Sequence, residues 1–327
     1  MISASIFIKT NFIRVLFTSF FILVSCLSTT DYTFYPPTEE VNFEEIQTEL
    51  QRIVNDVENG DYGKTNSLII YKNDKLLIQE YFNNWDKEDL HFQYSVTKSI
   101  TSVLIGIAIN KGYIKSENER LMSFFPEYLA SNEITSEQSK ITITDLLSMR
   151  AGFKWDEWTY SYTDTRNDAN RLIRSDDMIK FMLDLAMDFS PGEKFTYNSG
   201  CSMLLSAILE RTTQMPVELF AEEYLFKEMG ITKWKWEQAK DGLFNTGWGL
   251  HLRPIDMLQI GKLYLSNGQF KGKQIISENW IGKSSFDYGN NYGFHWWLSN
   301  NGEIISARGW GGQYIFCLLY TSDAADD

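Results

Sequence analysis

The chain has 327 residues, of which 43% are hydrophobic, and it contains 10 Trp, 17 Tyr and 22 Phe. Such a chain can bury a sizeable core, which argues against global disorder, and its length fits one large domain or two small ones. The formal charge of −13 argues against nucleic acid as a partner and against a polybasic membrane patch, because both need clustered Lys and Arg.

The N-terminus has the pattern of an export signal. Lys9 and Arg14 precede an apolar run over residues 15–24, which is too short for a membrane-spanning helix and has the length of a signal h-region. The run ends in Leu23-Val24-Ser25-Cys26, which resembles a bacterial lipobox. This resemblance implies a lipoprotein signal peptide over residues 1–25, a lipid anchor on Cys26 and a location at the cell envelope, on the periplasmic face or the cell surface. An ordinary signal peptide with an incidental Cys is the alternative.

Residues 26–43 are interpreted as a tether, and residues 44–316 as the folded domain. Apolar residues at helical spacing predict a helix over residues 44–58. Two strand-like runs, 66–71 and 75–82, are separated by Asn73-Asp74 and predict a β-hairpin. The segment 95–111 predicts a helix buried on all sides, because it is apolar almost all round after its first turn.

The rest of the chain is mostly helical until strands return near its end. Residues 156–175 are interpreted as a surface loop, and helices are expected over 143–149, 199–211 and 253–266. Residues 292–298 and 303–308 predict strands joined by Asn301-Gly302, a type I′ turn signal, with a third strand starting near Gly311. This order predicts an α/β fold of the α+β type, whose sheet is built from both ends of the chain and whose helical subdomain, about residues 91–245, is inserted.

Several common chemistries have no signature in the sequence. There is no Gly-x-Ser-x-Gly elbow and no phosphate-binding glycine loop. His91, His251 and His295 lie in unrelated contexts and no Cys/His cluster accompanies them, so structural or surface roles are expected and neither metal nor cofactor is predicted. Cys201 is interpreted as a small buried apolar residue.

The segment Ser95-Val96-Thr97-Lys98 carries the strongest catalytic signal. A Ser hydroxyl is a poor nucleophile until a base takes its proton, and residues i and i+3 of a helix share a face. Burial in an apolar helix would favour the neutral amine that a base requires. About one Ser-x-x-Lys match is expected by chance in a chain of this length. The alternative is therefore a helix N-cap at Ser95 with Lys98 reaching water.

Two further elements suggest a cleft. Tyr197-Asn198-Ser199 follows the Pro191-Gly192 turn and precedes a helix, where a side chain can point into a site. Gly309-Trp310-Gly311-Gly312-Gln313 opens a strand, and its glycines let the backbone approach a ligand closely. A bulge at a sheet edge is the alternative for the second element.

Taken together, these elements resemble the serine β-lactamase and penicillin-binding superfamily. The likeness is to its class C-like branch, which includes family VIII carboxylesterases, D-aminopeptidases and 6-aminohexanoate-dimer hydrolases. It runs from about Ser67 to Phe316 in five ordered blocks: residues 93–99, 146–152, 191–200, 253–257 and 309–313. The resemblance implies an antiparallel sheet flanked by helices, beside a helical subdomain, with the site between them.

The resemblance also assigns roles to individual residues. It implies that Ser95 attacks a carbonyl while Lys98, aided by Tyr197, takes its proton. Tyr197 then protonates the leaving group and activates the water that hydrolyses the acyl-enzyme. Substrate binding would fall to Ser199 and to the strand-opening segment Trp310, Gly311, Gly312 and Gln313. The oxyanion hole would be the backbone N–H groups of Ser95 and Gln313, often the largest single catalytic contribution.

Two departures from the β-lactamase pattern bear on the substrate. Ser199 stands where β-lactamases have Asn, and Trp310 stands where they carry a Lys that helps bind the substrate carboxylate, although Arg308 lies nearby. An indole cannot replace that charge, so an ester or small amide is the preferred substrate. D-Ala-type peptidase or β-lactamase activity is the runner-up. A non-catalytic, lipid-anchored binding or sensor protein is the alternative of another class.

The last eleven residues, 317–327, are expected to be foreign to the natural protein. Their sequence, from Cys317 to Asp327, resembles an in-frame translation of a transposase-type sequencing adaptor. The superfamily continues here with another strand and a C-terminal helix. Without these elements an apolar face of the sheet would be open to solvent. A genuine acidic terminus is the alternative, and long-read sequencing of the source DNA distinguishes the two.

Overall fold

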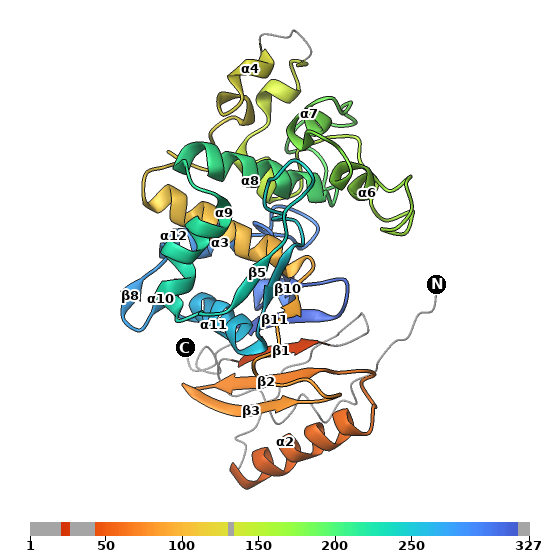
Figure 1. Cartoon of the computed structure of the whole chain (residues 1–327). Helices are drawn as coiled ribbons and strands as arrows, with labels where there is room; N and C mark the ends of the chain where they lie inside the picture. Colours follow the sequence, from red (N-terminus) through yellow and green to blue (C-terminus); the bar gives the residue numbers. More distant parts are fainter. Residues whose placement is uncertain (1–20, 27–42, 130–133, 320–327) are drawn as a thin grey trace.

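A computed structural model describes residues 21–26, 43–129 and 134–319. Its large sheet has six antiparallel strands in the order β3-β2-β1-β11-β10-β9, so strands from both ends of the chain meet in one sheet (Figure 1). This arrangement confirms the predicted fold class. The strands are β1 (Phe21–Cys26), β2 (Ser67–Lys72), β3 (Lys75–Tyr81), β9 (Trp297–Ser299), β10 (Ile304–Arg308) and β11 (Gln313–Leu318).

Each face of this sheet packs on different helices, because successive strand residues point to opposite faces. Ile69 and Ile315 belong to the main core, whereas Leu68, Ile70 and Phe316 belong to a second cluster. The second cluster is closed by the amphipathic helix α2 (Phe43–Glu58), which lies outside the sheet in Figure 1. Strands β2 and β11 are therefore buried on both faces, whereas the edge strand β3 is largely exposed or half-buried.

Strand β1 differs from the sequence prediction. Residues 21–25 were assigned to a removed signal peptide and Cys26 to a lipid anchor, yet Phe21–Cys26 pairs with β2 on one side and β11 on the other. A chain processed before Cys26 would lose all of β1 except its last residue. The strand and the cleaved leader therefore exclude one another in any single molecule.

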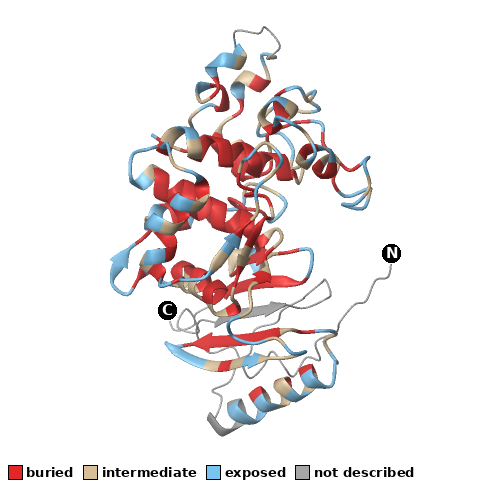
Figure 2. Cartoon of the chain, in the orientation of Figure 1, coloured by how far each residue is buried: buried red, intermediate tan, exposed pale blue. Residues whose placement is uncertain are grey.

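Helix α3 (Val96–Asn110) runs through the middle of the main core, as Figures 1 and 2 show. Every residue from Val96 to Ala108 is buried, in agreement with the prediction for residues 95–111. It packs on α8 (Ser199–Thr213), which is also buried along most of its length. These two helices bring the Ser95 segment and the Tyr197 segment together.

The remaining elements surround these two helices and the sheet. The helices are α4 (Pro126–Leu129), α5 (Ile143–Leu147), α6 (Asp168–Ile173), α7 (Met178–Leu183), α9 (Val217–Ala221), α10 (Lys227–Met229), α11 (Pro254–Leu265) and α12 (Glu278–Ser284), with a π-helical turn at Glu222–Phe226 and 3₁₀ turns at Leu121–Ser123, Gln138–Lys140 and Asn300–Gly302. Short strands form two small sheets, β4 (His91–Phe92), β6 (Leu250–Leu252) and β5 (Trp234–Trp236) in one, and β7 (Gln269–Phe270) and β8 (Lys273–Gln274) in the other.

The prediction of a surface loop over residues 156–175 was wrong in part. The segment ends in helix α6, and its turn is organised by Asn167, which is fully buried. The Asn167 amide donates to the carbonyls of Glu157 and Tyr160, and its Oδ1 caps α6. A loop held from within in this way can form a fixed wall of a site.

The predicted C-terminal hairpin also differs in detail. Strand β9 begins only at Trp297, and β9 and β10 are joined by a 3₁₀ turn over Asn300–Gly302 rather than by a two-residue turn. Phe294 and Trp296 lie before the strand and are buried in the main core. These aromatic residues alternate with Gly293 and His295, and this alternation resembles the pattern of a strand.

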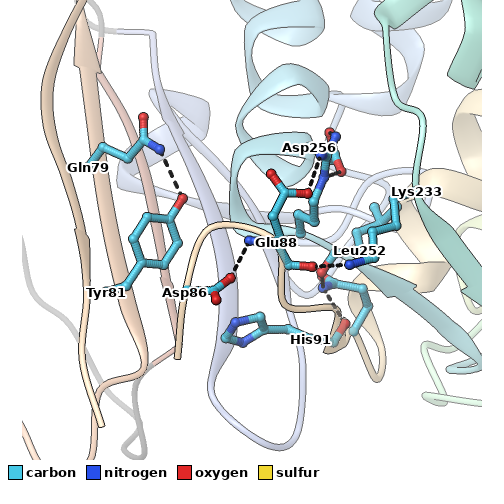
Figure 3. A network of polar contacts seen from close by, with 10 residues as sticks. Gln79, Tyr81, Asp86, Glu88, His91, Lys233, Leu252 and Asp256 are labelled. Atoms are coloured by element: carbon cyan, nitrogen blue, oxygen red, sulfur yellow. Dashed lines mark hydrogen bonds and ion pairs between the residues drawn. The ribbon is translucent and has the colours of Figure 1, made fainter. Parts of the chain in front are cut away.

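The segment that leads into Ser95 is held by polar contacts, which Figure 3 shows. Lys233 Nζ donates to the Glu88 carbonyl over 2.6 Å. The buried Gln93 side chain donates to the carbonyls of His91, at 2.8 Å, and Leu252, at 3.4 Å. The bond to Leu252 ties the approach to the candidate nucleophile to β6, and the bond from Lys233 ties it to the residue before β5.

Strand β11 extends beyond the predicted domain end at Phe316. Cys317 and Leu318, which were assigned to the foreign tail, are both buried in the sheet, and residues 320–327 lie outside the described residues. The foreign origin of residues 317–327 stays a prediction. Cys201 and Cys317 are buried free thiols, and no helix within the described ranges has the length and hydropathy to cross a membrane.

Candidate active site

Ser95 lies at a sharp strand-to-helix turn. Tyr94, just before it, has a φ of 45°, a left-handed conformation that is strained for a residue with a side chain. Ser95 is the N-cap residue of α3, but its hydroxyl makes no capping hydrogen bond. Ser95 therefore occupies the N-cap position, as the alternative expected, but its side chain does not cap the helix. The side chain instead lines two adjoining cavities.

Lys98 does not reach water, because only 1% of its surface is exposed. Its Nζ lies 3.2 Å from Ser95 Oγ and donates to the Gly247 carbonyl over 2.7 Å. Burial lowers the pKa of Lys98 to about 8, against the opposing effects of Glu157 and Cys201. A neutral amine can thus accept the Ser95 proton while one N–H stays bonded to Gly247.

Tyr197 is the third member of this cluster. It lines the larger cavity together with Ser95, and burial, followed by the nearby Glu157 carboxylate, raises its pKa above the ordinary value. Its ring is stacked on Trp297 with centroids 5.8 Å apart, and Lys98 Nζ lies 5.0 Å from its centroid. Tyr197 is therefore held as a protonated phenol, a donor and not a tyrosinate base.

Ser199 is positioned by the start of α8. Asn198 caps this helix through Oδ1, which accepts from the backbone of Gly200 and Cys201. Ser199 donates its backbone N–H to Glu157 Oε2 over 2.7 Å and its hydroxyl to Glu157 Oε1 over 2.9 Å. The predicted substrate-binding Ser199 thus lines the smaller cavity with its hydroxyl committed to a carboxylate.

Glu157 was not predicted from the sequence. It follows Asp156 in a segment rich in acids, where nothing in the residue pattern separates a buried carboxylate from a solvated one. The structure buries it to 2% exposure at the wall of the larger cavity.

The predicted glycine-rich segment lies against the nucleophile. A Cβ placed on Gly309 would lie 2.7 Å from the Gln93 carbonyl oxygen, and one on Gly311 would lie 2.6 Å from the Tyr94 ring. The Gly309 N–H donates to the Gln313 carbonyl over 2.7 Å and closes the turn. This close approach brings the start of β11, with Gln313, beside the Ser95 segment, as the inferred oxyanion hole requires.

Trp310 projects from this turn and is 73% exposed. Its ring meets Tyr94 edge-on at 5.8 Å and Tyr162 at 6.2 Å between centroids. Trp310 and Tyr162 both line the two cavities, whereas Gly311, Gly312 and Gln313 line neither. Among Trp310, Gly311, Gly312 and Gln313, Trp310 is thus the residue whose side chain lines the two cavities, and the other three can contribute backbone groups.

The smaller cavity, of about 320 Å³, opens beside Ser95 and has no Lys, Arg, Asp or Glu among the described residues that line it. Its lining residues are Phe92, Tyr94, Ser95, Ser161, Tyr162, Thr163, Ala169, Asn170, Ile173, Ser199, Trp248 and Trp310.

The larger cavity, of about 710 Å³, contains the charged groups. Arg308 lines it and donates to the hydroxyls of Ser306 and Ser299, over 2.9 and 3.1 Å, and lies over the Trp297 ring. Glu157 and Tyr197 line the same cavity. The Arg308 guanidinium in this cavity is therefore already hydrogen-bonded to two serine hydroxyls of the protein.

The three histidines contact groups other than Ser95, Lys98 and Tyr197. His91 is buried against Trp85, His251 contacts Glu237, and His295 Nε2 meets Ser202 Oγ at 3.0 Å. Burial lowers the pKa of His91 to about 4 and that of His295 to about 3. In the part of the chain that the structure describes, no group of three or more His, Cys, Asp or Glu side chains could hold a metal ion.

Comparison with known proteins decides the family. The Beta-lactamase family model matches residues 64–321. The chain belongs to the Beta-lactamase family. It is a serine hydrolase, as predicted, and its family match encloses every predicted site residue except Cys26.

Three proteins similar to this Beta-lactamase family chain are each less than 25% identical to it. The 6-aminohexanoate-dimer hydrolase of Paenarthrobacter ureafaciens is 22% identical over 283 residues, which are 77% of this chain and 69% of that protein. The hydrolase EstCE1, described as having promiscuous acyltransferase activity, is 12% identical with a TM-score of 0.64, over 83% of this chain and 93% of that one. The octameric penicillin-binding protein homologue from Pyrococcus abyssi is 16% identical with a TM-score of 0.64, over 84% and 73%. The structural likenesses show the fold.

The pKa of Lys98 predicts a pH profile for this Beta-lactamase family hydrolase. Protonated Lys98 cannot accept the Ser95 proton, so kcat/KM should rise by about tenfold per pH unit below the pKa and level off above about pH 8. Initial rates with a neutral ester, corrected for spontaneous hydrolysis, measure this limb. A profile that is flat or falling between pH 6 and 8 would contradict the role of Lys98.

A second prediction concerns the glycine-rich turn. Gly309→Ala should lower kcat by about a hundredfold, because the turn must move away from Gln93 and small misplacements at a reacting centre are costly. Gly282→Ala is the matched control, since nothing lies within 4 Å of a Cβ there, and it should leave kcat unchanged. Equal kcat values in the two variants would show that the turn does not shape the site.

Proposed function

We propose that this serine hydrolase acts on neutral carboxylic esters and small amides through an acyl-enzyme on Ser95. The observation that carries the proposal is the uncharged, aromatic cavity beside Ser95, with Trp310 at its rim where β-lactamases carry a cation. An apolar acyl group fits such a cavity, since burial of apolar surface supplies binding energy. Among the described residues that line the smaller cavity there is no Lys or Arg for a substrate carboxylate to bind.

The proposed reaction has two halves. Ser95 Oγ bonds to the substrate carbonyl carbon while its proton passes to neutral Lys98, and the N–H groups of Ser95 and Gln313 hold the oxyanion. When the tetrahedral intermediate collapses, the bond to the leaving group breaks and Tyr197 delivers a proton to the departing oxygen or nitrogen, while the Lys98 ammonium passes its proton to Tyr197. Water then attacks the acyl carbon and gives up a proton, which is relayed through Tyr197 to neutral Lys98. When this second intermediate collapses, the bond to Ser95 breaks, the acid leaves, and Lys98 returns the proton to Ser95 Oγ.

The distances and burial support this assignment over a non-catalytic binding protein. Lys98 is held 3.2 Å from Ser95 Oγ at 1% exposure, and burying an amine without using it would be costly. D-Ala-type peptidase or β-lactamase activity would need the substrate carboxylate to bind Arg308, which already donates to Ser306 and Ser299. That activity is therefore the second candidate.

We also propose that the protein is exported and held at the cell envelope by a lipid on Cys26. The support is the sequence pattern of residues 9–26, which precedes the family match beginning at residue 64. In the processed form the position of β1 between β2 and β11 would have to be filled by another segment or left open.

The hydrolase proposal predicts that Ser95→Ala abolishes turnover of p-nitrophenyl butyrate and that Lys98→Ala lowers it by orders of magnitude, because the two residues act as a unit. Ser102→Ala, on the same helix, should retain activity. Wild-type kcat/KM should be far higher for p-nitrophenyl butyrate than for nitrocefin. Full activity in Ser95→Ala would refute the mechanism, and a clear preference for nitrocefin would reverse the substrate assignment.

The anchor proposal predicts that the protein expressed in a bacterium partitions into detergent, and that Cys26→Ala blocks its processing or releases it. Cys201→Ala is the control and should partition like the wild type. Mass spectrometry of the N-terminus separates a lipid-modified Cys26 from an intact chain that keeps β1. Identical partitioning of wild type and Cys26→Ala would refute lipidation.

A further inference from the structure

Glu157 is a buried carboxylate that the proposed reaction does not use. It lies between α5 and α6 with 2% of its surface exposed, at the wall of the larger cavity. Oε2 accepts from Trp155 Nε1 and from the Ser199 backbone, both at 2.7 Å. Oε1 accepts from the hydroxyls of Ser199, at 2.9 Å, and Tyr162, at 3.2 Å. Every bond it makes is thus one in which an ionised carboxylate accepts.

These four donors come from parts of the site that must keep their relative positions. Tyr162 belongs to the wall shared by the two cavities, where its ring meets Trp310. Ser199 opens α8 and lies two residues after Tyr197. A single carboxylate therefore joins the aromatic wall to the start of α8, next to the proton donor Tyr197.

The charge of Glu157 also affects the pKa values of Lys98 and Tyr197. The titratable groups around Lys98 and Tyr197 come from every element packed there: Glu157 and Tyr162 from the loop, Cys201 from α8, and Tyr292 and His295 from the segment before β9. Burial lowers the pKa of His295 to about 3, and burial raises the pKa values of Cys201 and Tyr292, so these three groups are neutral near pH 7. Among these neighbours, Glu157 is the anion facing Lys98.

We propose that Glu157 is a positioning residue that fixes Ser199 and Tyr162 and serves as the buried counter-charge of the Ser95-Lys98-Tyr197 cluster. The inference rests on the proposed function of that cluster. The carboxylate favours the charged form of Lys98 and so opposes burial, which lowers the pKa of Lys98. It disfavours a tyrosinate at Tyr197 and so acts with burial, which raises the pKa of Tyr197. It therefore keeps Tyr197 a proton donor and sets the lower end of the active pH range.

Glu157→Gln separates the charge from the hydrogen bonds. Trp155 and the Ser199 backbone are donors only, so the amide oxygen would face them. The amide NH₂ would then face the hydroxyls of Ser199 and Tyr162, which can turn and accept. The variant can keep all four contacts while it loses the negative charge. Glu157→Ala removes both.

The experiment compares the pH dependence of kcat/KM for p-nitrophenyl butyrate in the wild type, Glu157→Gln, Glu157→Ala and Glu117→Gln. Glu117 is a buried glutamate paired with Lys283 outside the two cavities, which makes it the matched control. Glu157→Gln should move the midpoint of the acid limb to lower pH without a loss of melting temperature. Glu157→Ala should move it in the same direction and also lower kcat, whereas Glu117→Gln should leave the midpoint unchanged.

The rate of Ser95 labelling by a fluorophosphonate gives the same titration without a substrate, and this separates the two proposals. No turnover of the ester by a protein that labels at Ser95 would overturn the ester assignment, while the labelling midpoints would still report on Glu157. A Glu157→Gln midpoint equal to that of the wild type, or at higher pH, would overturn the counter-charge. An equal shift in Glu117→Gln would do the same.

Discussion

The burial of the Lys98 amine beside the Ser95 hydroxyl is the constraint on which the rest of the site depends. A buried ammonium is costly, and this cost lowers the pKa of Lys98 to about 8. Near neutral pH a fraction of the amine is therefore unprotonated and can accept a proton. Helix α3 makes the burial possible because it is apolar on all sides and runs through the main core. Each surrounding element then has one role: the Gly247 carbonyl orients the amine, Tyr197 donates a proton to the leaving group, and the Gly309 turn brings β11 to the reacting centre.

The substrate surfaces follow from what surrounds this buried pair. One cavity beside Ser95 is aromatic and free of charged side chains among its described residues, and the other contains Glu157 and Arg308. Tyr162 and Trp310 meet between them. Ser95 therefore faces two environments of different polarity, and Trp310 lines both.

Much of this arrangement could be predicted from the sequence, because the signals were local. The apolar α3, the hairpin β2-β3 and the Ser95-x-x-Lys98 spacing each depend on residues close in the chain. Glu157 could not be predicted, since its burial depends on Ser199, 42 residues further on. The strand expected over 292–298 was right only for Trp297 and Leu298, because the buried aromatic residues of the irregular segment before them alternate as strand residues do. The pairing of β1 with β2 and β11 could not be predicted from local sequence, because the same apolar run also fits an export signal.

The central claim is that Ser95 is the nucleophile and that Lys98 activates it. The most direct measurement is mass spectrometry of the protein after reaction with a fluorophosphonate at neutral pH, with the adduct located by peptide sequencing. The account predicts a single adduct on Ser95 in the native protein, and none after heat denaturation, because the activation depends on the buried amine and the folded turn. An adduct on another residue, or an unmodified native protein, would contradict it.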